Sequence, residues 1–179
     1  MKRKALFLDR DGVINEDVNF VGTVERFAFK QGIFAFLRAV QSLGYRLVVV
    51  TNQSGVARGL YTATDHETVT AHMLAALAHE GITIDAVETC YHHKDGTVPP
   101  YNRASFWRKP NAGMILDAAQ RLGIDLTRSA MIGDREGDML AAQNAGIPVR
   151  LLLSASAALP EGAARMASFD EALAFLKKA

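Results

Sequence analysis

The chain has 179 residues, a formal net charge of +1 and one cysteine. This length favours a single domain, expected to span residues 1–179, and the near-zero charge gives no broad attraction to nucleic acid or to a membrane surface. No apolar run approaches the roughly 20 residues of a membrane span, and Cys90 alone excludes an internal disulfide. The basic N-terminus precedes an apolar run too short for a signal peptide, so we expect a cytoplasmic protein and, by default, a monomer.

Short apolar runs alternate with helical patterns along the chain. This alternation predicts an α/β fold: a three-layer, Rossmann-like parallel sheet with helices on both faces and no room for a large cap domain. A loop or small hairpin lying over a site is expected at 14–30, and a long loop at 91–109. Strands are expected at 5–8, 46–50, 84–90, 130–132 and 149–153, and helices at 33–41, 64–80, 112–122 and 140–145 and after Ser168, with capping boxes at 64–67 and 168–171 and a cap at Asn111.

Two aspartates, Asp9 and Asp11, follow the first strand at once. In such sheets the carboxyl ends of the strands are where ligands bind. If the extended geometry persists, both carboxylates point to the same side. Two like charges so near each other are costly without a cation or a shared proton, so the pair predicts a divalent metal. Oxygen ligands suit Mg²⁺.

Reactive polar groups also follow other predicted strands. Thr51 ends the second strand, Asp134 follows the fourth, and Lys109 belongs to the long loop after the third. Parallel strands bring their carboxyl ends to one edge of the sheet, so these side chains should converge with Asp9. This convergence of four elements carries more weight than any single motif.

Together these elements resemble the haloacid dehalogenase (HAD) superfamily of phosphotransferases, over nearly the whole chain. The finer pattern in segments 7–15, 48–59 and 108–110 resembles the heptose-1,7-bisphosphate 7-phosphatase family. The histidinol-phosphate phosphatases share the Asp-Arg-Asp-Gly element and the Thr-Asn-Gln segment, so that activity stays open as an alternative. The motifs that carry the resemblance are Asp9-Arg10-Asp11-Gly12, Thr51-Asn52, Lys109-Pro110 and Gly133-Asp134 with Asp138.

The resemblance implies a Mg²⁺-dependent phosphatase that acts on a small phosphorylated sugar in the synthesis of lipopolysaccharide or another heptose product. It implies that Asp9 is the nucleophile and forms an aspartyl-phosphate. Asp11 would protonate the leaving oxygen and then deprotonate the attacking water. The metal would bind the Asp9 carboxylate, the Asp11 backbone carbonyl and Asp134. The groups expected to stabilise the transferring phosphoryl are the Thr51 hydroxyl, the amide of Asn52 and the Lys109 ammonium.

Substrate contacts are expected from several segments. Arg108 is expected to recognise the second phosphate, because a bidentate arginine suits that geometry, although a solvated loop charge is the simpler alternative. Arg135 is either a substrate contact or an exposed residue at a helix start. Asp138 either lies behind the metal or is an acid favoured at a helix N-terminus. Arg58 is either a contact to the second phosphate or a solvated loop charge, with the loop charge slightly favoured. The remaining expected contacts are Asp17, Val18, Asn19 and Phe20 in the loop over the sugar, and Gln53 and Ser54.

One departure from the family pattern concerns zinc. Heptose phosphatases often carry a zinc held by Cys-x-His after the third strand and by Cys-x-Cys before Arg-Lys-Pro. Here 90–92 supplies the first half, but 105–107 reads Ser-Phe-Trp. A structural zinc needs four ligands, so we predict no zinc. Instead, the 91–109 loop is expected to pack through Phe106, Trp107 and Pro99-Pro100, and the histidines of the 64–80 helix, His66, His72 and His79, are expected at the surface.

A phosphoaspartate receiver module is the alternative from another functional class. Such modules also place an aspartate nucleophile, acidic metal ligands, a threonine and a lysine on a five-stranded parallel sheet. A receiver, however, carries its nucleophile after the third strand and lacks an acid/base two residues further on. Here Asp9 follows the first strand and Asp11 is that partner, which favours an enzyme that turns over.

Overall fold

The computed structural model describes residues 3–178, and within them six parallel strands form one sheet in the order β3-β2-β1-β4-β5-β6. Five strands were expected, and the short β6 was missed. Because β1 lies between β2 and β4, the strand order reverses at β1, which is the position where such sheets bind ligands. The strands are β1 (Ala5–Leu8), β2 (Arg46–Asn52), β3 (Ala86–Cys90), β4 (Ala130–Gly133), β5 (Val149–Leu152) and β6 (Ala164–Arg165).

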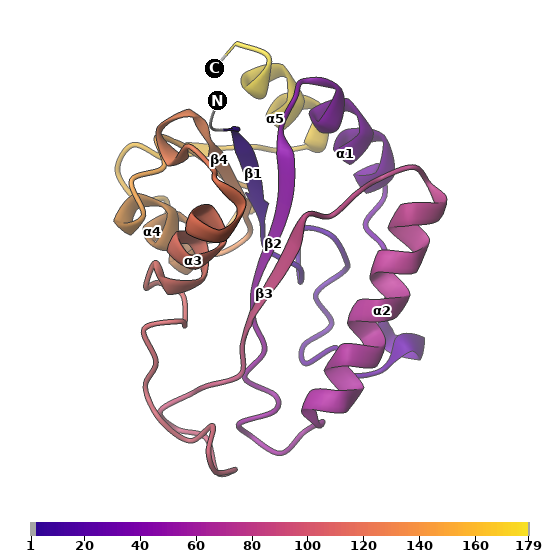
Figure 1. Ribbon diagram of the computed structural model, residues 1–179, viewed down its shortest axis with the longest axis vertical. Coiled ribbons are helices and arrows are strands. Elements are labelled where there is room, and N and C mark those ends of the chain that lie inside the picture. The colour runs from indigo at the N-terminus through magenta and orange to yellow at the C-terminus, as the bar shows by residue number, and fades with distance from the viewer. Residues whose placement is uncertain (1–2, 179) are drawn as a thin grey trace.

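Helices cover both faces of the sheet, which confirms the three-layer prediction. The apolar cores place α1, α2 and α5 on one face and α3 and α4 on the other. Figure 1 shows α3 and α4 to the left of the strands and α1 and α2 to the right. Every α-helix of residues 3–178 packs in one of these layers, and none is long and apolar enough to cross a membrane. The helices are α1 (Ile33–Ser42), α2 (Ala63–His79), α3 (Gly113–Leu122), α4 (Glu136–Asn144) and α5 (Phe169–Leu176), with short 3₁₀ turns η1 (Val24–Arg26) and η2 (Leu126–Arg128).

The alternation of side chains along β1 divides the core between the two faces. Leu6 and Leu8 pack in the core beneath α1, α2 and α5, whereas Ala5 and Phe7 pack beneath α3 and α4. All four side chains are fully buried. A central strand covered on both faces must be apolar throughout, so the first polar residues after it fall at the sheet edge.

Helix starts differ from the expected ones where side chains form other caps. The capping box of α2 joins Thr62 and Asp65, not residues 64 and 67: Thr62 Oγ1 accepts the Asp65 N–H at 3.1 Å and Asp65 Oδ2 accepts the Thr62 N–H at 2.8 Å. Asn111 does not cap α3, because its Nδ2 donates to Ser105 O at 3.1 Å. At α5, Ser168 Oγ accepts the Glu171 N–H as expected, but Glu171 Oε2 accepts from Ala167 instead of closing the box.

Two expectations, about the long loop and about the histidines of α2, are wrong in part: His72 and His79 are exposed as expected. Phe106 is 63% exposed and does not pack the loop, whereas Trp107 is half-buried against the core beneath α3. His66 is buried, with its Nδ1 3.0 Å from the Tyr91 hydroxyl, and burial followed by the charge of Arg10 lowers its pKa to about 4. The loop is instead held to α2 through this contact, and Pro99 and Pro100 stay exposed as well.

Candidate active site

A cleft of about 440 Å³ opens beyond the carboxyl ends of β1 and β2. Most of the expected site residues line it, so sequence segments more than 100 residues apart meet there. Thr51 and Asp134 lie directly beside lining residues, and Val18 is 47% exposed next to the cleft. Of the residues left open, Arg58 and Asp138 both line the cleft. The expected residues that line it are Asp9, Asp11, Asp17, Asn19, Phe20, Asn52, Gln53, Ser54, Arg108, Lys109 and Arg135.

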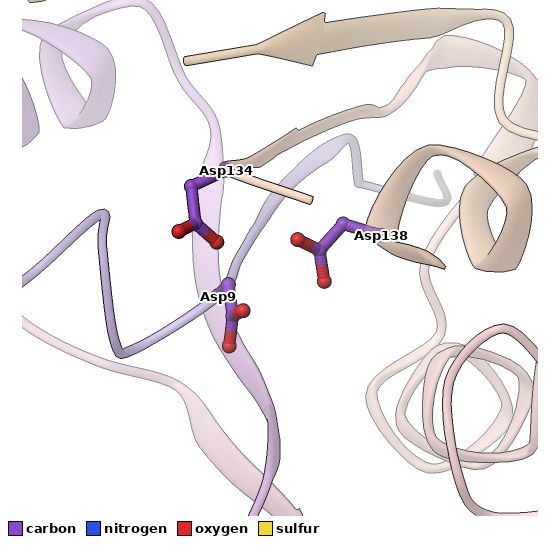
Figure 2. A group of neighbouring side chains, drawn as sticks. All are labelled: Asp9, Asp134 and Asp138. Atoms are coloured by element: carbon purple, nitrogen blue, oxygen red, sulfur yellow. The ribbon is translucent and has the colours of Figure 1, made fainter. Parts of the chain in front are cut away.

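Three carboxylates gather at the floor of this cleft. One oxygen each from Asp9, Asp134 and Asp138 lies within 4.8 Å of the other two, and Figure 2 shows the three groups together. They come from the end of β1, the end of β4 and the first turn of α4. Asp134 Oδ1 is buried and accepts no hydrogen bond from residues 3–178. Converging carboxylate oxygens with an unpartnered buried atom fit a hard divalent cation such as Mg²⁺.

Two glycines make this approach of carboxylates possible. Gly12 has φ +82°, and a Cβ there would overlap the Asp134 carboxylate. A Cβ on Gly133 would likewise overlap the Asp138 side chain. Both positions therefore need glycine for the space it leaves, and Gly12 needs it also for its left-handed backbone.

Lys109 ties the carboxylate group together. Its Nζ lies 2.9 Å from Asp9 Oδ1 and 2.6 Å from Asp138 Oδ1, and it donates to Val50 O at 2.8 Å. The Asn52 side chain holds the lysine backbone from both sides: Nδ2 donates to Lys109 O, and Oδ1 accepts the Lys109 N–H, each at 3.1 Å. The side-chain amide of Asn52 thus positions Lys109, a contact that spans 57 residues of sequence.

The floor of the cleft carries more negative than positive charge, because Asp9, Asp134 and Asp138 surround Lys109. Burial, and then the charge of Asp138, raise the pKa of Asp9 to about 8 although Lys109 opposes the shift. Burial and Asp138 also raise the pKa of Asp134 to about 6. Burial disfavours the charged form of Lys109, but Asp138 and Asp9 together raise its pKa above the ordinary value. A bound cation would relieve the repulsion that these shifts express.

The Asp11 carboxylate stays outside the metal-binding group. Its Oδ1 accepts from Arg10 Nη2 at 2.9 Å and from Asn15 Nδ2 at 2.9 Å, and its Oδ2 accepts from Gln53 Nε2 at 2.8 Å. The strand ends at Leu8, so the extended geometry does not persist to Asp11, contrary to expectation. Asp138 takes the place of Asp11 beside Asp9, while the expected contact of the metal with the Asp11 backbone carbonyl stays a prediction.

The outer part of the cleft is held by exposed contacts. Arg135 Nη2 lies 2.6 Å from Asp17 Oδ2, so the loop after β1 is joined to the start of α4. Asn19 and Phe20 have φ of +57° and +51°, in the left-handed region that is uncommon for residues other than glycine. Arg58 Nη2 lies 3.2 Å from His93 Nε2.

Sequence reasoning missed three side chains of the site. Arg10 is fully buried and Tyr61 lines the cleft, and both contact Gln53. His93 lines the cleft beside Arg58. No local pattern marks Tyr61 or His93, since each reaches the cleft through the path of a loop. Arg10 sits inside the Asp-Arg-Asp-Gly motif, so its position was the signal available.

The comparisons with known proteins agree with this arrangement. A family model described as HAD-hydrolase-like matches residues 106–172. The solved heptose 1,7-bisphosphate phosphatase of B. bronchiseptica, in complex with magnesium and phosphate, is 31% identical with a TM-score of 0.84, covering 98% of this chain and 99% of that one. The fold and the acidic site thus define a HAD-type phosphatase.

Curated relatives narrow the assignment further. The D-glycero-beta-D-manno-heptose-1,7-bisphosphate 7-phosphatase of Rhodopseudomonas palustris is 47% identical over 147 residues, covering 82% of each chain. The D-glycero-alpha-D-manno-heptose-1,7-bisphosphate 7-phosphatase of Burkholderia mallei is 44% identical over 153 residues, covering 86% of this chain and 81% of that one. This chain belongs to the heptose-1,7-bisphosphate 7-phosphatase family.

Proposed function

We propose that this protein removes the 7-phosphate of D-glycero-D-manno-heptose 1,7-bisphosphate through an aspartyl-phosphate intermediate, in the supply of heptose for lipopolysaccharide or a related product. The observation that carries the reaction is the contact of Lys109 Nζ with Asp9 Oδ1 at 2.9 Å, inside a group of three carboxylates. The names of the relatives carry the choice of substrate.

The proposed reaction has two steps. In the first, an Asp9 carboxylate oxygen attacks phosphorus, the bond to sugar oxygen O7 breaks, and Asp11 gives its proton to that oxygen. In the second, Asp11 takes a proton from water, whose oxygen attacks the aspartyl-phosphate and releases inorganic phosphate with a free Asp9. Lys109 and the Thr51 hydroxyl stabilise the charge on the phosphoryl oxygens in both steps.

Mg²⁺ is part of this proposal. Asp9, Asp134 and the backbone carbonyl of Asp11 would hold it, and when bound it neutralises negative charge at the phosphoryl group. Asp138 acts on Lys109, since its Oδ1 lies 2.6 Å from Nζ. Its Oδ2 also accepts the Arg135 N–H at 3.0 Å, which is the contact expected of an acid at a helix N-terminus, while a place behind the metal remains part of the proposal.

The remote part of the substrate would meet the outer cleft. Arg58, Arg108 and Arg135 all line it, and burial, followed by the charges of Arg58 and Arg135, lowers the pKa of Arg108. Such a group of cations suits the second phosphate of a bisphosphate. The loop carrying Asp17, Val18, Asn19 and Phe20 would contact the sugar, as would Ser54 and the backbone of Gln53.

The deciding experiment measures phosphate release from both anomers of the heptose bisphosphate and from histidinol phosphate, with Mg²⁺ and with a chelator. Both anomers are needed because the curated relatives include enzymes named for each. We expect kcat/KM for one heptose anomer to exceed that for histidinol phosphate by at least about 100-fold, an amount that a few specific polar contacts supply. Faster turnover of histidinol phosphate would assign the alternative activity.

Asp11→Asn separates the enzyme from a phosphoaspartate signalling module. We expect this variant to lose turnover while still binding Mg²⁺, because the proposed metal contact is to the backbone. Loss of Mg²⁺ binding in the variant, measured by calorimetry, would refute the role given to Asp11. Wild-type protein that accumulates a long-lived acyl phosphate without turnover would instead favour the signalling module.

We further propose that the enzyme works as a cytoplasmic monomer without zinc. Within residues 3–178, the group able to hold a metal through three or more side chains is Asp9, Asp134 and Asp138; Cys90, His92 and His93 form no such group. Elemental analysis of purified protein tests the zinc proposal, and one equivalent of tightly bound zinc would contradict it. Light scattering during gel filtration tests the monomer.

A further inference from the structure

Gln53 has a side chain whose hydrogen-bonding capacity is used entirely within the protein. It is 2% exposed. Its Nε2 donates to Asp11 Oδ2 and to Thr51 Oγ1, each at 2.8 Å. Its Oε1 accepts from the Tyr61 hydroxyl at 2.5 Å and from Arg10 Nη2 at 3.3 Å. A glutamine amide offers two donors and two acceptor positions, so none is left for a substrate.

The chemistry of its neighbours fixes which way this amide faces. The Arg10 guanidinium can only donate, so it needs the amide oxygen as its partner. Turning the amide over would place Nε2 against the Arg10 donor. The observed orientation is therefore the one in which Oε1 faces Arg10 and Nε2 faces Asp11.

Tyr61 holds the oxygen of this amide in place. Its ring lies against Gly22 and Gly55, and a Cβ on either glycine would overlap it. Burial raises the pKa of Tyr61 to about 12, so the hydroxyl keeps its proton and remains a donor at neutral pH. The loops that carry Gly22 and Gly55 thus support the same amide through Tyr61.

The fixed direction has a consequence for Thr51. Because Gln53 Nε2 donates to Thr51 Oγ1, the hydroxyl oxygen acts as the acceptor in that bond. Its own hydrogen is then free to donate elsewhere. Stabilising a transferring phosphoryl group requires donors aimed at its oxygens. An acceptor in the place of Nε2 would instead draw the Thr51 hydrogen away from the cleft.

We propose that Gln53 is a positioning residue that fixes the direction of two hydrogen bonds. One orients the Asp11 carboxylate, and the other makes the Thr51 hydroxyl a donor toward the phosphoryl group. This inference rests on the roles that the proposed function gives to Asp11 and Thr51. It replaces the expectation that the Gln53 side chain contacts substrate, because that side chain has no free donor or acceptor. Gln53 acts through its two neighbours and does not touch the reacting atoms.

Gln53→Glu is the test, because it keeps the shape of the side chain and removes both N–H donors. The new carboxylate would accept the Thr51 hydrogen and repel Asp11. We expect kcat to fall by about 10²–10³-fold, the usual effect of removing one donor to a developing charge, while KM changes by less than about threefold. Gln41→Glu is the matched control, since Gln41 also bonds through both ends, to Gly81 O and Thr83 N, but belongs to α1.

Tyr61→Phe is the second variant, for which folding is safer because the ring and its glycine contacts remain. Losing one neutral donor to Oε1 should lower kcat by about 2–10-fold with KM unchanged. Thermal melts of all three variants accompany the kinetics. If Gln53→Glu does not fold, the result for Tyr61→Phe decides alone.

Each outcome has one meaning. A kcat within twofold of wild type in the folded Gln53→Glu variant, or in Tyr61→Phe when it decides alone, overturns the inference. A raised KM with unchanged kcat does so too, because it assigns a substrate contact. All proteins are assayed on the heptose bisphosphate and on p-nitrophenyl phosphate. Wild type active only on the second substrate would count against the proposed function, while the variants could still be compared on p-nitrophenyl phosphate.

Discussion

Ion pairs form both the floor of the cleft, where Lys109 meets Asp9 and Asp138, and its rim, where Arg135 meets Asp17. The two sets of pairs differ in burial. On the floor, the Lys109 and Asp138 side chains are each 3% exposed. On the rim, the Arg135 side chain is 66% exposed and that of its partner Asp17 is 22% exposed. Breaking a buried pair leaves an uncompensated charge and costs several kcal/mol, whereas an exposed pair contributes up to about 1 kcal/mol. The floor is therefore fixed before substrate arrives, while the rim can rearrange around it.

The largest effect should come from the floor. Asp9→Asn removes the proposed nucleophile but keeps an oxygen that can accept from Lys109 and from the Arg10 N–H. In the wild-type protein, this N–H donates to Asp9 Oδ1 at 2.7 Å. We expect kcat/KM to fall by at least about 10⁴-fold, as removal of a covalent nucleophile does. The thermal midpoint should not fall below that of wild type, because Lys109 keeps its ion pair with Asp138. Asp117→Asn, at the Arg121 pair on α3, serves as the control. Residual turnover above one hundredth of wild type would remove Asp9 from its role.

A comparison of two glycines tests whether the floor needs the space that Gly12 leaves for the Asp134 carboxylate. Gly12 and Gly44 both have φ +82°, but a Cβ would overlap the Asp134 carboxylate at Gly12 and meets nothing within 4 Å at Gly44. Gly44→Ala should cost about 1 kcal/mol of stability, for the backbone alone, and leave kcat unchanged. Gly12→Ala should cost more and lower kcat by about 10²-fold through the displaced Asp134. Equal effects of the two variants on thermal unfolding and turnover would show that the overlap is relieved without consequence.

The pH dependence of stability should report the acidic floor. In the metal-free protein the pKa of Asp9 is raised from 3.8 to about 8 and that of Asp134 from 3.8 to about 6. Between pH 4 and 8 the folded state therefore binds more protons than the unfolded state, so the free energy of unfolding falls as pH rises.

Mg²⁺ should reverse this loss, because it binds the ionised carboxylates. We expect 10 mM Mg²⁺ to raise the thermal midpoint by at least about 3 °C more at pH 8 than at pH 5, which corresponds to about 1 kcal/mol for a chain of this size. Melts in chelator and in Mg²⁺ at both pH values measure it. The same shift at pH 5 and pH 8 would mean that the raised pKa values are not those of the metal-binding group.

The smallest effect is expected at the rim. Asp17→Asn weakens the pair with Arg135 and should raise KM by about 2–5-fold, leave kcat nearly unchanged and shift the thermal midpoint by less than about 2 °C. Arg38→Gln breaks a similarly exposed pair, 2.7 Å long, between Arg38 of α1 and Glu80 at the end of α2, and should leave KM unchanged. A tenfold or larger fall in kcat for Asp17→Asn would mean that the rim is as fixed as the floor.

The floor could be predicted because its residues follow strands directly. Asp9, Thr51 and Asp134 each come within one residue of the end of an apolar run, and a parallel sheet then brings them together. The sheet and both helical layers were predicted for the same reason, since buried runs and helical periods are local patterns. The short β6 was missed because two residues carry no period.

Residues that depend on long-range contacts were missed or misplaced. His66 occupies a helix position that a sequence pattern assigns to the surface, but Tyr91 from the long loop covers it. Asn111 has the right side chain for a cap and uses it for Ser105 instead. Tyr61 acquires its role from glycines at two other places in the chain. In each case the partner lies in an irregular segment, whose path no local rule determines.

The central position of β1 also bears on biosynthesis. Leu6 pairs with Leu47 on one side and with Ala130 on the other, so one neighbour is translated early and the other late. Because chains leave the ribosome N-terminus first, β1 can pair with β2 on one edge while its other edge stays unpaired. More than eighty residues separate Leu47 from Ala130, the partner on that second edge. Asp9 likewise has no cationic counterpart until Lys109 has been synthesised. Insertion of β4 next to β1 thus closes the second edge of β1 and brings Asp134 beside Asp9 in one event.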